Sequence, residues 1–262
     1  MDILLPFEED SVDFIDELVK SWGGLVVPFF SSNPKSKTKV NGFGSGFLVR
    51  FSGSHYLVTA LHVINDALSH DTVVLNIKGK GIVLENLKFF IDSDNDIAAA
   101  PIDEFLMRNG INSVQAVELD NEKTSFKPSG FHLLMGYPGS KNKLDTKWDK
   151  VDRKLYSFTA KICSAAPNVN TEISDHVLFD FDPKDQVDSN FKSVGKPPHL
   201  YGMSGGPAFE IHQKRVSEGE LKFYVRLTGV LVEWHQNKKV VIAAKKEALT
   251  NLLQSNKSVA YG

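Results

Sequence analysis

From residue 24 onward, the sequence consists of short apolar runs separated by clusters of Gly, Ser, Asn and Asp. The runs are rich in Val, Ile, Phe and Thr, residues that favour extended backbone. Many such runs in series, bounded by turn-forming residues, indicate a barrel or sandwich of strands. We therefore predict an all-β fold. The runs lie at residues 25–30, 46–51, 55–61, 72–77, 82–91, 131–137, 154–162, 176–181, 206–211, 222–234 and 239–244.

Helices are expected near the two ends of the sequence. Apolar residues recur at helical spacing in residues 11–20, where Ser11 is a plausible N-cap. Residues 245–254 carry three leucines and are predicted to form a second helix. Two polar stretches, residues 140–153 and 183–198, are expected to be long loops, and loops of this length are often functional.

Composition excludes several classes of protein. The formal net charge is -2, with 30 basic and 32 acidic residues, so the basic face of a nucleic-acid-binding protein is not expected. No apolar run approaches the roughly 20 residues that cross a membrane, and a signal peptide is not expected, since the first residues lack a basic region and their apolar stretch is short. Cys163 is the single cysteine, which excludes an internal disulfide and favours a cytoplasmic location. No motif for a metal or cofactor is present, and neither is expected.

The most informative motif is YGMSGGPAF, residues 201–209. A serine between glycines can lie in a tight turn that exposes its hydroxyl. The amides of Gly202 and Ser204 could then stabilise an oxyanion, each contributing about 3 kcal/mol. A glycine-rich turn with an inert serine is the alternative.

The same motif also fits the G-x-S-x-G nucleophile elbow of α/β-hydrolases. An elbow requires a strand before the serine and a helix after it. Here Pro207 and the alternating apolar residues after it predict a strand. The rest of the sequence also lacks alternating strands and long helices, so an α/β-hydrolase is disfavoured.

A serine hydroxyl needs a neighbouring base, and the base needs an acid that orients it. Among eight histidines, His62 stands out because it ends an apolar run. Asp96 lies at a polar-to-apolar boundary, with Asp92 and Asp94 as competitors. Taken alone, His62 could be a core histidine and Asp96 a turn cap. Catalysis by Cys163 is a weaker alternative, because its surroundings are typical of a buried strand residue.

Together the three residues are more specific. Their order is His62, Asp96, Ser204, with spacings of 34 and 108 residues. This order differs from those of the α/β-hydrolases and the subtilisins. It assigns the histidine and the aspartate to the first half of the chain and the serine to the second half.

With these motifs, the sequence resembles the trypsin/chymotrypsin-like serine peptidase superfamily, including HtrA-like and other intracellular bacterial members. The resemblance covers roughly residues 22–242 and implies two packed six-stranded antiparallel β-barrels, with the active site between them and short helices at both ends. It rests on GSGFLV (44–49), YLVTALHV (56–63), DIAAAPI (96–102), GYPGS (136–140) and GMSGGPAF (202–209).

The resemblance also implies a division of the chain into four parts. We expect an N-terminal helical extension at 1–21, a first barrel with His62 and Asp96 at 22–125, a second barrel with Ser204 at 126–242, and a C-terminal helix and tail at 243–262.

Two positions depart from the family pattern. Met203 stands where members activated by cleavage carry an aspartate, so activation through that salt bridge is not expected. Pro198 stands at the base of the primary pocket, where trypsin-like members carry an aspartate, so cleavage after Lys or Arg is not supported. The other residues expected to bind substrate are His199, Val232, Glu233 and Trp234.

These inferences predict an intracellular serine endopeptidase that acts on a protein or peptide through an acyl-enzyme. Cellular logic, rather than any residue, suggests regulation by an activating protein partner and a role in stress or anti-phage defence. Two alternatives stay open. One is a peptide-binding module on the same fold with little or no catalysis, and the other is a serine esterase that uses the same triad.

Overall fold

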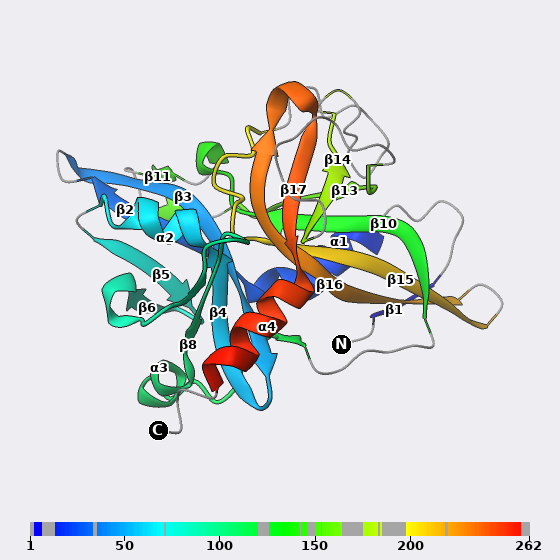
Figure 1. Ribbon diagram of the computed structural model, residues 1–262, viewed down its shortest axis with the longest axis horizontal. Coiled ribbons are helices and arrows are strands. Elements are labelled where there is room, and N and C mark those ends of the chain that lie inside the picture. Colours follow the sequence, from blue (N-terminus) through cyan, green and yellow to red (C-terminus); the bar gives the residue numbers. More distant parts are fainter. Residues whose placement is uncertain are drawn as a thin grey trace.

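The computed structural model describes residues 3–6, 14–33, 36–70, 72–119, 126–141, 143–145, 150–152, 154–163, 175–182, 184, 198–217 and 220–257. In this part of the chain, strands dominate and form two largely antiparallel sheets (Figure 1). The all-β prediction is confirmed. The helices are short: α1 (Phe14–Trp22), α2 (Leu61–Ala67), α3 (Asp103–Arg108) and α4 (Lys246–Lys257).

The first sheet has the strand order β6-β5-β2-β3-β4-β8-β7. The chain passes from β6 through the short turn Leu84–Asn86 into β7, so one bent segment joins the two ends of this sheet. Six strands were predicted for this barrel, but its main path has seven, and no pairing of β6 with β7 closes it among the described residues. We refer to this sheet as the first barrel. The strands are β2 (Val26–Asn33), β3 (Ser36–Phe51), β4 (Ser54–Ala60), β5 (Val73–Ile77), β6 (Lys80–Val83), β7 (Phe90–Asp92) and β8 (Ile97–Pro101). Three short strands are added to β3 or to each other: β9 (Val117–Glu118), β11 (Lys143–Asp145) and β12 (Lys150–Asp152).

The second sheet has the order β13-β10-β15-β16-β17-β14, and β1 pairs with the beginning of β16. Beyond β13, the amide of Cys163 donates to the carbonyl of Leu178 at 2.9 Å, and the amide of Asp180 donates to the carbonyl of Lys161 at 2.9 Å. These bonds close six strands into a barrel. The strands are β1 (Ile3–Pro6), β10 (Lys127–Gly136), β13 (Tyr156–Ala160), β14 (His176–Asp180), β15 (Pro207–Ser217), β16 (Glu220–His235) and β17 (Val240–Lys245).

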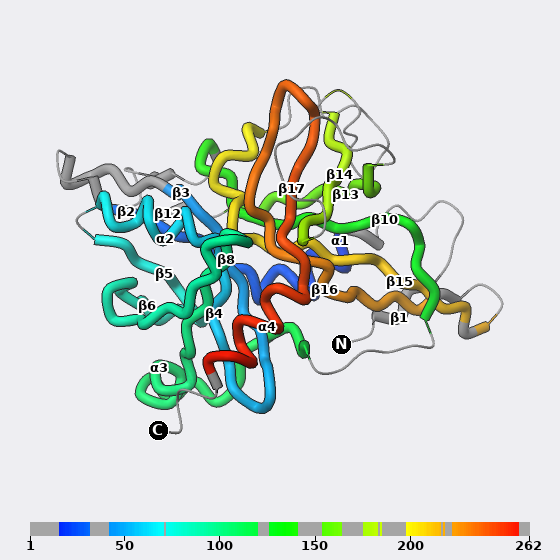
Figure 2. The backbone as a smooth tube through the Cα atoms, viewed as in Figure 1, coloured from blue at the N-terminus to red at the C-terminus, as the bar shows by residue number. Residues whose placement is uncertain are grey.

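Each predicted apolar run overlaps a strand, but several details differ from prediction. The run at 82–91 covers the end of β6, the turn Leu84–Asn86 and the start of β7, so it supplies parts of two strands. The run at 55–61 ends as a strand at Ala60, and α2 begins at Leu61. The loop expected at 140–153 contains the hairpin β11–β12. Ser11 lies outside the described residues, as does nearly all of the loop expected at 183–198. Figure 2 traces the path of the backbone through these elements.

The strands of the second sheet are apolar on both faces. On β10, Leu134 packs inside the second barrel, whereas its neighbours Leu133 and Met135 belong to the larger core that also fills the first barrel. Successive residues of a strand point to opposite faces, so one strand can supply two cores. The two barrels therefore pack through a continuous apolar layer.

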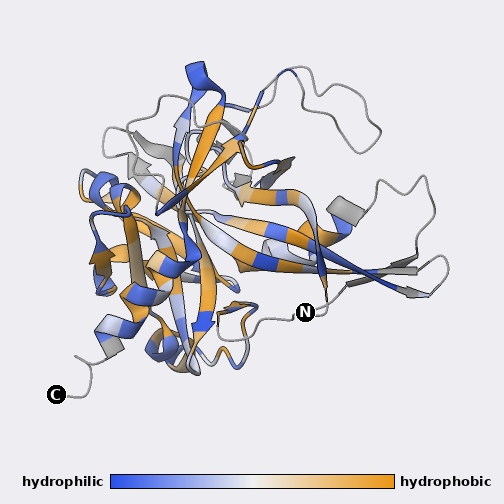
Figure 3. Cartoon of the chain, turned by 45° about the vertical axis from the view of Figure 1, so that its right-hand side comes forward, coloured by the Kyte–Doolittle hydropathy of each residue, from blue (hydrophilic) through white to orange (hydrophobic). Residues whose placement is uncertain are grey.

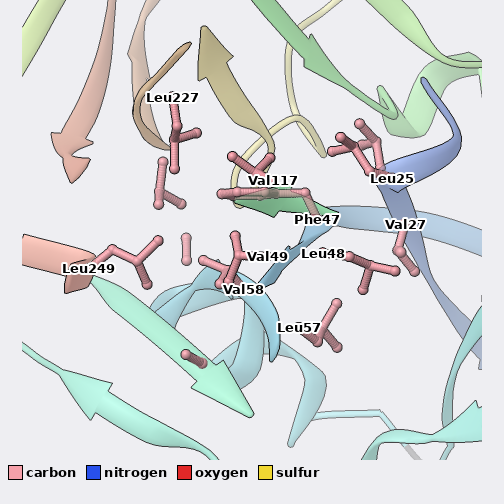
Figure 4. Packing of buried hydrophobic residues seen from close by; sticks show 14 of the residues in the cluster. Leu25, Val27, Phe47, Leu48, Val49, Leu57, Val58, Val117, Leu227 and Leu249 are labelled. Atoms are coloured by element: carbon pink, nitrogen blue, oxygen red, sulfur yellow. The ribbon is translucent and has the colours of Figure 1, made fainter. Parts of the chain in front are cut away.

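Helix α4 seals this layer. Figure 4 shows Leu249 of α4 beside Val49 and Val58 of the first sheet and near Leu227 of the second. Leu249 is fully buried, which stabilises the fold by about 2 kcal/mol relative to an exposed side chain. In Figure 3, the strands of both halves carry most of the hydrophobic residues, whereas this helix has mixed character. No helix in the described part of the chain has both the length and the apolar character that a membrane crossing requires.

A cluster of ionisable side chains, in which both histidines are buried and one arginine is exposed, lies on β10, β15 and β16. Glu210 lies opposite His132 on one neighbouring strand and opposite Arg226 on the other. Its Oε2 atom is 2.6 Å from Nε2 of His212 and 3.2 Å from the Arg226 guanidinium. The Nδ1 atoms of His132 and His212 are buried and have no hydrogen-bond partner among the described residues. We refer to these four residues as the histidine–glutamate cluster.

Candidate active site

His62 is the second residue of α2, directly after the end of β4. Its amide donates to Oδ1 of Asp96 at 2.8 Å, and its Nδ1 atom is 2.6 Å from Oδ2 of the same carboxylate. An ionised Asp96 can only accept, so Nδ1 carries the proton in the neutral ring and Nε2 is left as an acceptor. This is the tautomer that a general base requires.

A tight turn between β7 and β8 presents Asp96. The carboxylate of Asp92 accepts hydrogen bonds from the amides of Asp94 and Asn95, both at 3.1 Å, and so stabilises the turn. Asp96 has a φ of 55°, in the left-handed region, which costs a residue other than glycine about 1 kcal/mol or more. Its carbonyl accepts from the amide of Leu61 at 2.9 Å. The structure thus brings Asp96 to His62 and uses Asp92 to support the turn.

The surroundings of His62 favour its charged form. Burial is the largest single influence and lowers the pKa of the imidazole. The hydrogen bond and charge of Asp96, with the charges of Asp66 and Glu233, outweigh burial and raise the pKa above its ordinary value of 6.5. The ring is therefore a stronger base than an isolated histidine, and its side chain is 41% exposed.

Ser204 lies in a turn just before β15. The turn is held by hydrogen bonds from the amide of Met203 to the carbonyl of Leu200 and from the amide of Gly206 to the carbonyl of Met203, both at 2.9 Å. Gly202 has a φ of +93°, which a side chain would strain. The amides of Gly202 and Ser204 donate to no residue that the structure describes.

The serine turn packs against the strand end that leads to His62. The carbonyl of Ser204 accepts from the amide of Ser45 at 2.9 Å. A Cβ atom at Gly205 would lie 2.0 Å from the carbonyl oxygen of Ser45 and 3.0 Å from the amide nitrogen of Ala60. No side chain fits there, so the backbone after the serine touches the chain two residues before the histidine.

The hydroxyl of Ser45 joins three of the sequence motifs. Its Oγ atom donates to the carbonyl of Gly202 at 2.7 Å and accepts from the amide of Tyr137 at 2.8 Å. A Cβ atom at Gly136 would lie 2.9 Å from Cα of Met203, so this approach also requires glycine. Sequence reasoning did not single out Ser45. The signal available was a polar residue between glycines in an otherwise apolar run.

A small pocket opens beside Ser204. Glu233 and Trp234, two residues predicted to bind substrate, line it. His199 packs its ring edge-to-face on Trp234, with centroids 4.6 Å apart. Pro198 and Val232 are not among the lining residues, and Val232 packs into the larger core. The full lining is Phe158, Leu200, Met203, Ser204, Leu231, Glu233, Trp234 and Val241.

Apart from Trp234, the apolar residues that line the pocket were not predicted to bind substrate. Phe158, Leu231 and Val241 alternate with neighbours in ordinary strands, and nothing in the sequence separates them from other core residues. They belong to the interior of the second barrel, so the pocket is the open end of that interior.

Cys163 has different surroundings from a catalytic thiol. Burial raises its pKa to about 12, and the nearby carboxylate of Asp180 adds to this effect. Its Sγ atom donates to Oδ1 of Asp180 at 3.0 Å. A thiol with this pKa is not ionised near neutral pH, so it is a poor nucleophile.

No protein-family profile and no curated protein matches this sequence. Among solved structures, one similar chain comes from a study of the intrinsically disordered Sesbania mosaic virus VPg protein. Its identity is 17% and its TM-score 0.48, with 88% of this chain and 90% of that chain covered. Another is the inactive form of a serine-to-alanine mutant of Rv3671c from M. tuberculosis H37Rv. Its identity is 14% and its TM-score 0.48, with 96% and 95% covered. Any assignment of function therefore depends on the site itself.

Proposed function

We propose that this chain is a serine endopeptidase in which Ser204 is the nucleophile, His62 the general base and Asp96 the residue that orients the base. One observation carries the proposal. The Asp96 carboxylate holds His62 by two contacts, at the strand end against which the Ser204 turn packs. A core histidine or an inert glycine-rich turn would not require this combination.

In the proposed reaction, Oγ of Ser204 attacks the carbonyl carbon of the scissile bond while Nε2 of His62 takes the hydroxyl proton. The amides of Gly202 and Ser204 stabilise the resulting oxyanion. When the C–N bond breaks, His62 gives its proton to the leaving amine and an acyl-enzyme remains. Water then attacks the ester, His62 takes a proton from it, and the carboxylic acid leaves as Ser204 recovers its hydrogen. Asp96 stays ionised throughout.

The edge of β16 favours a peptide over a small ester. Strand β15 pairs with β16 only as far as Val230, and Leu231 then bonds to Gly206 and Gly205 of the serine turn. From residue 232 to 235, this edge of β16 has no strand partner among the described residues. An extended peptide can add to such an edge through backbone hydrogen bonds.

Labelling with a fluorophosphonate probe tests the chemistry. The wild-type protein should be labelled at Ser204, Ser204→Ala should not be labelled, and His62→Gln should be labelled at least about 1,000-fold more slowly. Ser69→Ala, which changes an exposed serine at the end of α2, is the matched control and should be labelled like the wild type. Wild-type labelling no stronger than that of Ser204→Ala would exclude the proposed nucleophile.

Regulation by a partner is a separate part of the proposal. It rests on the cellular cost of unrestrained proteolysis, and most of the loop expected to respond lies outside the described residues. A pull-down with Ser204→Ala under native conditions should recover a protein that accelerates cleavage by the wild type. A wild-type protein that is already fully active alone would contradict this part.

A further inference from the structure

The pocket beside Ser204 is shallow. Most of its lining residues are apolar, Phe158 and Val241 among them, and the space inside is only about 20 Å³. That is close to the room taken by a single water molecule. A long side chain has no space to enter unless the wall moves. A methyl or isopropyl group needs a smaller adjustment of the lining.

Among the described residues that line the pocket, Glu233 is the only acidic one. Its side chain is 54% exposed, and its charge acts on His62 as well as on the pocket. The carboxylate therefore lies at the exposed rim of the pocket. Oε1 is 3.1 Å from Nε2 of His235.

A β-bulge shapes the β16 wall of the pocket. Neighbouring residues of a regular strand point to opposite faces, so Leu231 and Trp234, three positions apart, could not both line one pocket on a regular strand. The register of β16 against β17 shifts between Leu231 and Glu233 and is regular from Glu233 to His235, which brings Trp234 to the same side as Leu231. Bulges redirect side chains in this way next to functional sites.

Building on the proposed peptidase activity, we propose that this site selects peptides by two features. A small apolar residue, such as Ala or Val, lies immediately before the cleaved bond, and Lys or Arg is among the three residues that precede this small residue. The shallow pocket excludes the longer side chains, including those of Lys and Arg. The cationic side chain lies along the rim and meets Glu233, while the peptide backbone pairs with residues 232–235 of β16.

Two matched variants separate this role from a general electrostatic effect on the base. The charges of Asp66 and Glu233 both act on His62, but only Glu233 lines the pocket. Glu233→Gln should reduce kcat/KM about threefold to fivefold for peptides with the basic residue, as expected for an exposed ion pair. For peptides with Gln at that position, the kcat/KM of Glu233→Gln should equal the kcat/KM of Asp66→Asn.

The experiment is cleavage of a peptide library by the full chain, with Ala, Val, Leu, Phe, Lys or Arg before the cut and Lys or Gln in the positions preceding it. Ala and Val should exceed Leu and Phe by at least about tenfold, since a poorly fitting methylene costs that much. Leu200→Ala should allow cleavage after Leu. Val241→Ala, which removes a smaller part of the pocket lining, is a second variant for the same test. Preferred cleavage after Phe, Lys or Arg, or equal losses in Glu233→Gln and Asp66→Asn, would overturn the inference.

Binding to Ser204→Ala separates failure of this inference from failure of the proposed function. The probes are N-acetylated tetrapeptides that end in Ala, Val, Leu or Phe, with either Lys at one of the first three residues in turn or Gln at all three. If Ser204 is not labelled but these peptides bind with the stated preferences, the catalytic proposal fails and the selectivity stands. If Ser204 is labelled but the preferences are absent, the selectivity alone is wrong.

Discussion

His62 and His132 lie in different barrels, and their surroundings change their protonation in opposite directions. His62 is 41% exposed and has a carboxylate oxygen 2.6 Å from Nδ1, and its pKa is raised. His132 is only 3% exposed, and its Nδ1 atom has no partner among the described residues. Burial lowers its pKa, with a smaller opposing effect from Glu210 and smaller supporting effects from His212 and Arg226.

This difference shows that burial alone does not determine how a histidine behaves. Both rings lose solvent, which favours the neutral form. Asp96 reverses the outcome at His62 because it contacts the ring directly. Glu210 does not reverse the effect of burial on the pKa of His132, because Oε2 of Glu210 is shared by His212 and Arg226. One histidine is suited to accept and return a proton, and the other stays neutral inside a barrel.

The largest expected effect comes from removing the charge that distinguishes the two histidines. Asp96→Asn should reduce kcat by about 10,000-fold, because an amide can hold the wrong tautomer of His62. His132→Leu is the control and should change kcat by less than about twofold. The measurement is peptide hydrolysis above the pKa of His62, with circular dichroism as a check of the fold. A loss below about tenfold in Asp96→Asn would mean that His62 does not need this partner.

The next effect concerns the histidine–glutamate cluster. Glu210→Ala leaves His212 buried without its acceptor and removes one partner of Arg226, so the free energy of unfolding should fall by about 2 kcal/mol. Glu210→Gln keeps the shape and an acceptor and should cost less. Urea unfolding measures both variants. Equal stability of Glu210→Ala and wild type would show that the cluster contributes no net stability.

A third effect is the dependence of stability on pH. His132 has a lowered pKa in the folded protein, so below pH 6.5 the unfolded chain binds a proton that the folded chain resists. The free energy of unfolding should therefore decrease as the pH falls from 6.5 through the lowered pKa. Each tenfold difference in proton affinity corresponds to about 1.4 kcal/mol. His132→Leu should show a flatter profile in urea unfolding at pH 5 to 7, and an unchanged slope would contradict the assignment.

The smallest effect should come from Asp66→Asn. This exposed charge is one of several that raise the pKa of His62, so its removal should lower that pKa slightly. The base must be neutral to accept a proton, so the acid limb of kcat/KM should move to lower pH. The plateau above it should change by less than about twofold, as is usual for an exposed charge. A shift of the limb to higher pH would contradict the stated electrostatics.

Much of the fold could be predicted from the sequence because strand formation leaves a local signal. Alternating apolar runs predicted the strands, and the order of His62, Asp96 and Ser204 predicted which half of the chain supplies each residue. Local signals did not predict contacts that depend on how distant strands pair. The buried hydroxyl of Ser45 and the pocket wall at Phe158 are examples, since both look like ordinary core positions until the barrels are assembled.

The histidine–glutamate cluster was missed for a related reason. His132 and Glu210 become partners only through the register of β10 against β15. In the sequence, each is a single polar residue in an apolar run. Nothing local predicted that they would be buried together.

The hydrogen bond between Ser45 and Gly202 has a consequence for the order of folding. It joins residues 157 positions apart, whereas the first barrel is built mainly from hairpins between neighbouring strands. Contacts between residues that are distant in the sequence form late, because the long segment between them must first be brought into a loop, which costs conformational entropy. A chain still emerging from the ribosome can complete the barrel that carries His62 and Asp96 before Ser204 has been synthesised. The proposed triad is therefore incomplete until the last third of the chain has been made and docked, so the order of synthesis itself delays the proposed proteolysis.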